Sequence, residues 1–330
     1  MHQEEVRRAL SKRSHGTISS RPGPSSKIEA PSGLWKAPRK AHRKRGNRLS
    51  KESRESLLHL SFPSPSSSPT TDTISHYQLG ESIGKGQYGT VYKAFNLETG
   101  EVVAVKRMNI EAQEEDEIES LMKEVELLKH LSHPNIVRYE GFIKCDGHLD
   151  IILEYMENGS LLATLRAYGV LSERLAASYV LGILEGLIYL HDREVVHCDL
   201  KAANLLTTKD GNVKLGDFGV SLNLKLTVDI GAMVAGTPNW MAPEVIELKG
   251  ASTASDIWSL GCTVMELVTG RPPYDGLLAM TTLFRIVEDE RPPIPDGLSP
   301  ELVEFLQMCF LKDPAQRPTA RELLHHSWLK

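Results

Sequence analysis

A short run near the middle of the chain concentrates side chains that suit one chemistry. Residues 197–204 read His-Cys-Asp-Leu-Lys-Ala-Ala-Asn. Asp199 can accept the proton of an attacking hydroxyl, Lys201 can hold a phosphoryl group in transfer, and Asn204 can ligate Mg²⁺. Asp217, in the later run Asp-Phe-Gly, offers a carboxylate to a second metal. Two metal ligands and a cation around a general base match the needs of phosphoryl transfer, because charge spreads over three equatorial oxygens.

A glycine-rich run precedes these residues. Residues 84–91 read Gly-Lys-Gly-Gln-Tyr-Gly-Thr-Val, and glycine lets backbone N–H groups come close to a phosphate. Dinucleotide-binding proteins use the same glycine spacing, but there it lies between a strand and a helix. We expect Thr90–Phe95 to be a strand, and a strand–loop–strand placement favours a flap over nucleotide phosphates.

A lysine on the next predicted strand completes the set. Lys106 ends the run Val-Ala-Val-Lys and can neutralise α- and β-phosphate charge. A cation aimed into a site needs a carboxylate to hold it. Glu124 and Glu126 are the candidates, and Glu124 is preferred because it lies one turn before Leu128 on the apolar helix face.

The periodicity around these residues predicts an α+β protein with two lobes. Alternating apolar residues predict five strands, with Gly84, Gly86 and Gly89 as turn residues: Tyr77–Ile83, Thr90–Phe95, Val102–Met108, Ile136–Phe142 and Leu149–Glu154. From Ser172, a predicted N-cap, helical spacing dominates and places Ala177, Val180, Leu181, Leu184 and Leu187 on one face. A strand-rich first part followed by a helix-rich second part is typical of separate lobes.

Composition separates a tail from this body. Residues 1–76 hold 15 Lys and Arg against 6 Asp and Glu, which leaves 23 against 37 in residues 77–330. The tail is rich in Ser and Pro and poor in aliphatic residues, so we expect it to be disordered. Its basic run 36–48 is interpreted as a solvated arm, with nuclear targeting or binding to acidic surfaces as the alternatives.

The remaining composition excludes several classes of protein. The four cysteines form no CxxC pair, so neither a zinc site nor a disulfide framework is predicted, and a reducing intracellular compartment is expected. No apolar run is long enough for a membrane span. We also expect no nucleic-acid partner for the acidic body.

Together these motifs resemble the eukaryotic protein kinase family. The glycine-rich loop, Val-Ala-Val-Lys, the catalytic loop, Asp-Phe-Gly and Ala242-Pro243-Glu244 follow the family's order. The resemblance covers residues 77–330 and implies an N-lobe of about 77–156, a C-lobe of about 157–330, and ATP with Mg²⁺ as cofactors. It also implies that Arg317 is the structural partner of Glu244.

The resemblance assigns a role to each matching position. Asp199 and Lys201 would be catalytic, and Asn204 and Asp217 would bind metal. Leu153 would be the gatekeeper, and backbone groups of Glu154 and Met156 would bind adenine. The implied nucleotide-binding set is Gly84, Lys85, Gly86, Gln87, Tyr88, Gly89, Val91, Ala104, Lys106, Glu124, Leu153, Glu154, Met156 and Leu206.

Further motifs indicate which group of protein kinases the chain resembles. Lys201, two positions after Asp199, marks Ser/Thr specificity, and residues 236–244 are typical of MAP kinase kinase kinases and sterile-type kinases. The run from His197 and the segments after Phe218 and Gly236 look like the fungal septation protein kinases. That likeness implies a protein substrate that is itself a kinase, a small GTPase activator, and a cytoplasmic protein at the spindle pole body or septum. Proteins of that family usually continue well past the kinase domain, so this sequence is expected to be a fragment or a short relative.

One residue departs from the family pattern. The family usually has Arg where this chain has Cys198, and that arginine pairs with a phosphate on the activation loop. We therefore expect activity without loop phosphorylation. The alternatives to a septation kinase are a general MAP kinase kinase kinase, a pseudokinase scaffold and a small-molecule phosphotransferase. The scaffold is disfavoured because no catalytic group is missing, and the phosphotransferase because the segment 218–244 is long enough for a peptide platform.

Overall fold

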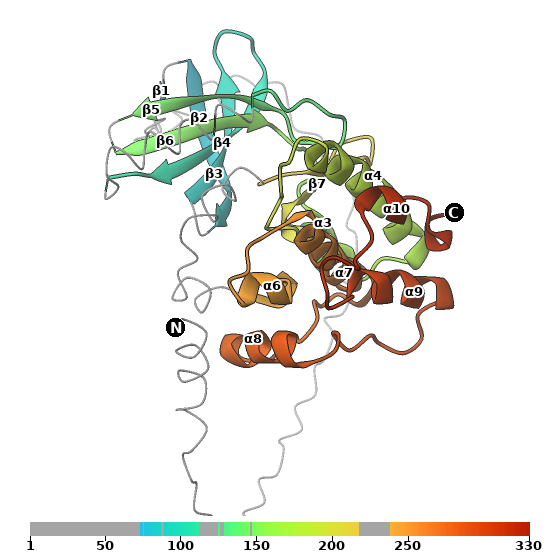
Figure 1. Cartoon of the computed structure of the whole chain (residues 1–330). Coiled ribbons are helices and arrows are strands. Elements are labelled where there is room, and N and C mark those ends of the chain that lie inside the picture. The colour runs from blue at the N-terminus through green and yellow to red at the C-terminus, as the bar shows by residue number, and fades with distance from the viewer. Residues whose placement is uncertain are drawn as a thin grey trace, which may run out of the picture. The chain divides into compact units, whose positions relative to one another are not determined.

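A computed structural model describes residues 73–74, 76–86, 89–111, 125, 129–145, 147–217 and 238–330. All of them belong to the compact unit Ser66–Lys330. Within this unit an antiparallel sheet occupies the first half and helices occupy the second (Figure 1). This is the α+β, two-lobed architecture that the periodicity predicts. Among the described residues, no helix has the length and apolarity that crossing a bilayer requires.

The N-lobe sheet has the strand order β1-β2-β3-β4-β6-β5. Its strands are β1 (Thr73–Ile74), β2 (Tyr77–Gly86), β3 (Gly89–Asn96), β4 (Val102–Asn109), β5 (Tyr139–Cys145) and β6 (His148–Glu154). Inward-facing residues at every second position, such as Val103 and Val105, form a small core with Leu79, Ala94 and Ile152. Lys106 lies on β4, next to this core.

The glycine-rich segment is a strand hairpin more than a loop, so treating all three glycines as turn residues was wrong. Gly84, Lys85 and Gly86 continue β2 and pair with Val91, Thr90 and Gly89 of β3. Pairing with β3 keeps Gly84 and Gly86 in strand β2, although glycine has a low β propensity. Gly89 has φ +148°, and a Cβ there would collide with the Arg107 carbonyl oxygen of the neighbouring strand.

The predicted strand Ile136–Phe142 was also misplaced, because β5 covers Tyr139–Cys145. The apolar residues before it pair with the other lobe instead. Val137 N donates to Leu215 O at 2.9 Å, and Leu215 N donates to Asn135 O at 2.8 Å. The segment before β5 therefore ties the two lobes together along strand β8.

Helices and a two-stranded sheet make up the C-lobe. The elements are α3 (Leu161–Tyr168), α4 (Glu173–His191), η2 (Ala202–Asn204), β7 (Leu205–Thr207), β8 (Val213–Leu215), η5 (Pro238–Trp240), α6 (Pro243–Ile246), α7 (Thr253–Thr269), α8 (Ala279–Glu288), α9 (Pro300–Cys309), α10 (Ala320–Leu323) and η6 (Ser327–Leu329). Ser172 caps α4, as predicted, by accepting from Leu175 N at 3.3 Å. Of the predicted α4 face, Leu181 is only half-buried and the other four residues are buried.

Helix α7 is the centre of the C-lobe. Thirteen of its residues are buried, including Trp258, which contacts Phe310 edge-to-face at 5.2 Å. A helix that is apolar on most sides must be surrounded by other elements, and α4, α9 and η5 all pack against it. Helix α7 is therefore a rigid support for the loop that contains residues 197–204.

A buried ion pair links the start of α6 to the end of the chain. Arg317 Nη1 and Nη2 each donate to one Glu244 oxygen at 2.7 Å, which confirms the predicted partnership. Burial alone would raise the pKa of Glu244, but the hydrogen bonds and charge of Arg317 lower that pKa below its ordinary value. A lowered pKa means that the pair stabilises the fold above the ordinary carboxyl pKa and loses this effect as pH falls.

We expect Arg317→Ala to destabilise the C-lobe by about 3–5 kcal/mol, because the substitution leaves the Glu244 charge buried without its partner. Denaturant unfolding at neutral pH would measure the change. The matched control is Arg321→Ala, which breaks the exposed pair with Asp192 and should cost less than about 1 kcal/mol. Equal losses for the two variants would contradict a structural role for the buried pair.

Candidate active site

The loop between α4 and η2 holds the predicted base. Both carboxylate oxygens of Asp199 accept from Lys201 Nζ, at 2.8 and 2.9 Å. Asn204 Nδ2 donates to Asp199 Oδ2 and to the Asp199 carbonyl oxygen, each at 2.8 Å. The Asp199 side chain remains 42% exposed, so a substrate hydroxyl can reach it. The loop thus brings three of the predicted residues into direct contact.

The second carboxylate meets the N-lobe lysine. Lys106 Nζ donates to Asp217 Oδ1 at 2.9 Å. Lys106 is buried to 8% side-chain exposure, whereas Asp217 is 39% exposed. The cation from β4 and the carboxylate after β8 therefore face the same space between the lobes. Lys106 and Asp217 are 111 positions apart in the sequence.

A buried histidine joins the two halves of the site. His197 Nε2 lies 3.2 Å from the Gly216 carbonyl oxygen, and its Nδ1 accepts from Asp199 N at 3.3 Å. Burial lowers the pKa of His197 below its ordinary value. The ring is therefore neutral, donates from Nε2 and accepts at Nδ1. It fixes the backbone of Asp199 against the residue that precedes Asp217.

Helix α7 also contacts the loop that contains Asp199. Asp256 is fully buried and accepts from His197 N at 2.8 Å and Cys198 N at 2.9 Å. Its Oδ2 also lies 2.9 Å from His191 Nε2, at the end of α4. A carboxylate can accept several hydrogen bonds at once, which offsets the cost of burying its charge.

Two further polar residues of α7 extend this support. Thr263 Oγ1 donates to Leu200 O at 3.3 Å, and Glu266 Oε2 accepts from Ala202 N at 3.0 Å. Glu266 Oε2 also accepts from Trp240 Nε1 at 3.1 Å. Burial raises the pKa of Glu266 above its ordinary value. The helix therefore contacts the loop repeatedly between His197 and Ala202.

The backbone is strained at two functional positions. Cys198 has φ +65° and Asp217 has φ +57°, a left-handed conformation that costs a non-glycine residue about 1–2 kcal/mol. The hydrogen bond from Cys198 N to Asp256 helps hold the first of these. Residues kept in such conformations by their surroundings are enriched at functional sites.

The predicted hinge lies at the end of β6. Leu153 pairs with Ala104 of β4, and Met156 is buried. Glu154 N donates to Arg138 O at 2.9 Å, so a ligand contact through Glu154 would have to use its carbonyl oxygen. Leu153 and Glu154 therefore lie on the strand that pairs with β4, the strand that carries Lys106.

An ion pair connects this hinge to the strand leading to Asp217. Both Glu154 carboxylate oxygens accept from Lys214 Nζ at 2.8 Å. Lys214 is the cross-strand partner of Leu206, a member of the nucleotide-binding set that the resemblance implies. The ion pair therefore fixes the hinge relative to β7 and β8.

Some predicted residues lie outside the described part of the chain. These are Gln87, Tyr88, Glu124 and its rival Glu126, and Phe218. The choice between Glu124 and Glu126 thus stays a prediction.

Sequence reasoning missed the residues that support the loop. It gave no role to Asp256, Thr263, Glu266 or Lys214. One signal was present in α7: Asp256, Ser259, Thr263 and Glu266 recur every three or four positions in an otherwise apolar helix. Polar residues at helical spacing on a buried helix indicate a common partner.

The donor set fits Mg²⁺. Magnesium prefers oxygen ligands, usually one or two carboxylates together with substrate phosphates. Both hydrogen bonds from the Asn204 side chain use Nδ2, which leaves Oδ1 as a ligand. Asp217 has an exposed carboxylate beside Lys106. Asn204 and Asp217 are therefore the residues that would hold the metal.

Comparison with known proteins agrees with this geometry. A family model described as "Protein kinase domain" matches residues 77–329. The cytokinesis protein sepH of Emericella nidulans is 53% identical over 256 residues, covering 78% of this chain and 19% of that protein. MAP3K epsilon protein kinase 1 of Arabidopsis thaliana is 52% identical over 257 residues, covering 77% and 19%. Cell division control protein 7 of Schizosaccharomyces pombe is 49% identical over 251 residues, covering 76% and 23%.

The chain thus spans about a fifth of the length of these relatives. The similarity lies in the domain that contains the site described above. On the match of that domain, its two-lobed fold and the residues gathered between its lobes, the chain belongs to the protein kinase family.

Proposed function

We propose that the chain transfers the γ-phosphoryl group of ATP to serine and threonine side chains of proteins, as a non-specific serine/threonine protein kinase. The observation that carries this proposal is the convergence of two groups of residues. Asp199, Lys201 and Asn204 form one hydrogen-bonded group. Lys106 and Asp217 form the other, and His197 connects the backbones of the two.

Each residue has a distinct part in the proposed reaction. Asp199 orients the substrate hydroxyl and accepts its proton. Lys201, already bound to Asp199, neutralises charge on the group in transfer, and Lys106 binds the α- and β-phosphates. Mg²⁺, when bound by Asn204 and Asp217, neutralises charge that develops on the phosphate oxygens.

We further infer a role in septation. The names of two relatives refer to cytokinesis and cell division control, and those of others to a MAP3K. The MAP3K name supports a protein substrate that is itself a kinase, and the cytokinesis name supports a location at the septum. A location at the spindle pole body rests on the resemblance. A small GTPase as activator rests on the resemblance alone.

We expect Asp199→Ala to lower turnover by about 10²–10⁴-fold while leaving ATP affinity nearly unchanged, because Asp199 acts on the hydroxyl and not on the nucleotide. Lys106→Met should lower both, since it removes a phosphate contact. Radiolabel transfer and nucleotide binding, measured on the same preparations, separate the two effects. Near-normal turnover in Asp199→Ala would remove Asp199 from the assigned role.

We expect activity to survive phosphatase treatment. Cys198 carries no positive charge that could pair with a loop phosphate, whereas an arginine at this position would. Thr227 carries the hydroxyl nearest the middle of the segment between Asp217 and Glu244. Turnover before and after treatment, with occupancy of Thr227 checked by mass spectrometry, measures the dependence. Thr227→Ala is the matched variant and should keep most of the activity. A tenfold loss, equivalent to about 1.4 kcal/mol, that follows Thr227 occupancy would contradict the prediction.

A further inference from the structure

Large apolar side chains lie on the outward face of α8 and on the two residues just before the helix. Leu277, Leu278, Met280 and Phe284 are exposed, Leu278 to 80% and Phe284 to 49%. Single exposed apolar residues are ordinary on a protein surface, but a group of them within one short segment indicates an interaction site.

The fold does not require these side chains. The inward face of α8 is already formed by the buried residues Thr282, Leu283 and Ile286. Lys312 Nζ holds the end of the helix by donating to the carbonyl oxygens of Ile286, Val287 and Asp289 at 2.6–2.8 Å. The exposed face is therefore a supported surface that has no partner among the described residues.

Acidic residues border this face. Met280, Phe284 and Glu288 follow one another at four-residue spacing, so they share one stripe of the helix. Between residues 277 and 304 there are six acidic and two basic side chains. Both basic ones are engaged, Arg285 with Asp289 at 3.2 Å and Arg291 with Glu290 at 3.8 Å. The net charge of the region is negative.

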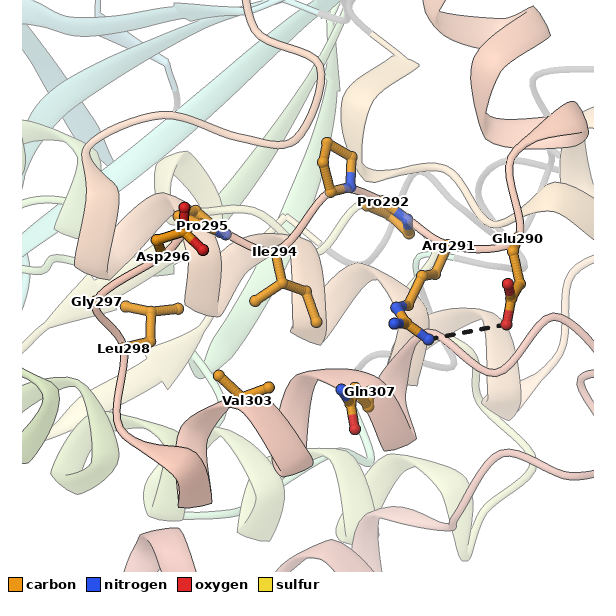
Figure 2. Close-up of a pocket in the computed structure, with 11 residues that line it drawn as sticks. Glu290, Arg291, Pro292, Ile294, Pro295, Asp296, Gly297, Leu298, Val303 and Gln307 are labelled. Carbon is orange, nitrogen blue, oxygen red and sulfur yellow. Dashed lines mark ion pairs between the residues drawn. The ribbon is translucent and has the colours of Figure 1, made fainter.

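A groove lies beside the loop that follows α8. It begins at Glu290 and runs beneath the loop 291–298 along α9. Figure 2 shows Ile294 directed from the loop toward Val303 and Gln307 of α9, with the Glu290–Arg291 pair at one end and Asp296 at the other. The groove thus places the apolar residues Ile294 and Val303 between charged residues at its two ends.

The surface lies beside the segment that leads to Ala242-Pro243-Glu244. Helix α8 packs against η5, and Asn239 Nδ2 of η5 donates to Pro273 O, just before α8, at 2.6 Å. In the proposed function this segment belongs to the peptide platform. A partner bound on α8 would therefore be held next to the peptide that enters the active site.

We propose that the exposed face of α8, made by Met280, Phe284 and Glu288 of the helix with the flanking residues Leu277, Leu278 and Glu290, is a docking site for a basic, apolar segment of the protein substrate. Negative charge at the rim selects Lys and Arg on the partner, and the apolar residues supply the contact area. The proximity to η5 favours the substrate as the occupant. This inference rests on the proposed kinase function and names how its substrate is recognised.

The test uses a short Ser/Thr acceptor peptide joined by a flexible linker to one of three 18-residue tags. One tag combines Lys and Leu at helical spacing, one replaces Leu with Ser, and one replaces Lys with Glu. We expect the Lys/Leu tag alone to lower KM, by about tenfold, because docking raises the effective concentration of the acceptor. The gain should disappear in the double variants Met280→Ser with Phe284→Ser, and Glu288→Lys with Glu290→Lys, while the untagged peptide is phosphorylated normally.

Matched controls are Tyr168→Ser, an apolar residue that is 85% exposed at the end of α3, and Asp210→Lys, an exposed acid in the turn between β7 and β8. Both should keep the gain. If the Lys/Leu tag gives no advantage, or if the advantage survives in the α8 variants, the proposal is wrong. Concentration-dependent self-association that the α8 variants abolish would assign the surface to a second copy and would also overturn the proposal.

Fluorescence anisotropy of the free Lys/Leu tag keeps this result separate from the proposed function, because binding needs no phosphoryl transfer. We expect saturable binding that weakens with added salt and is lost in the α8 variants. An enzyme that binds the tag but labels no peptide would contradict the kinase function alone. An active enzyme that does not bind the tag would contradict only the docking site.

Discussion

The site depends on one buried carboxylate. Asp256 accepts from two consecutive backbone N–H groups, those of His197 and Cys198, and lies against His191 at the end of α4. These contacts hold Cys198 in a left-handed conformation, and the next residue is Asp199. The position of the proposed base is thus set by a helix that is buried on most sides. Because protein interiors are closely packed, such a support resists displacement.

Around this support, the two lobes meet through a few specific contacts. Lys106 comes from the N-lobe sheet and Asp217 follows a C-lobe strand. The backbone of the same strand, β8, is hydrogen-bonded through Leu215 to the segment before β5. Its Lys214 side chain forms an ion pair with Glu154 of the hinge. One short strand therefore positions the proposed metal ligand, the hinge and the junction of the lobes. This arrangement brings together residues 111 positions apart, as the proposed phosphoryl transfer requires.

Local pattern predicted most of the fold and the chemistry, but not the support. The strands at residues 90–95 and 102–108 were placed to within one residue at each end, because alternating burial is a local property. The extension of β2 through Gly84–Gly86 was missed, since pairing across strands outweighs glycine's poor propensity there. The strand at Ile136 was misplaced because an apolar run does not reveal which lobe covers it. Asp256 could not be assigned a role, since its partners lie 58–65 positions earlier.

We propose that the groups around Asp199 transfer the γ-phosphoryl group of ATP to serine and threonine in proteins. The most direct measurement is phosphoryl transfer by the full chain from labelled ATP to three peptides that differ only in having Ser, Thr or Tyr as acceptor, with and without Mg²⁺. We expect label on Ser and Thr, almost none on Tyr, and none without the metal. Binding of ATP without transfer to any of the three peptides, or preferential labelling of Tyr, would contradict the claim.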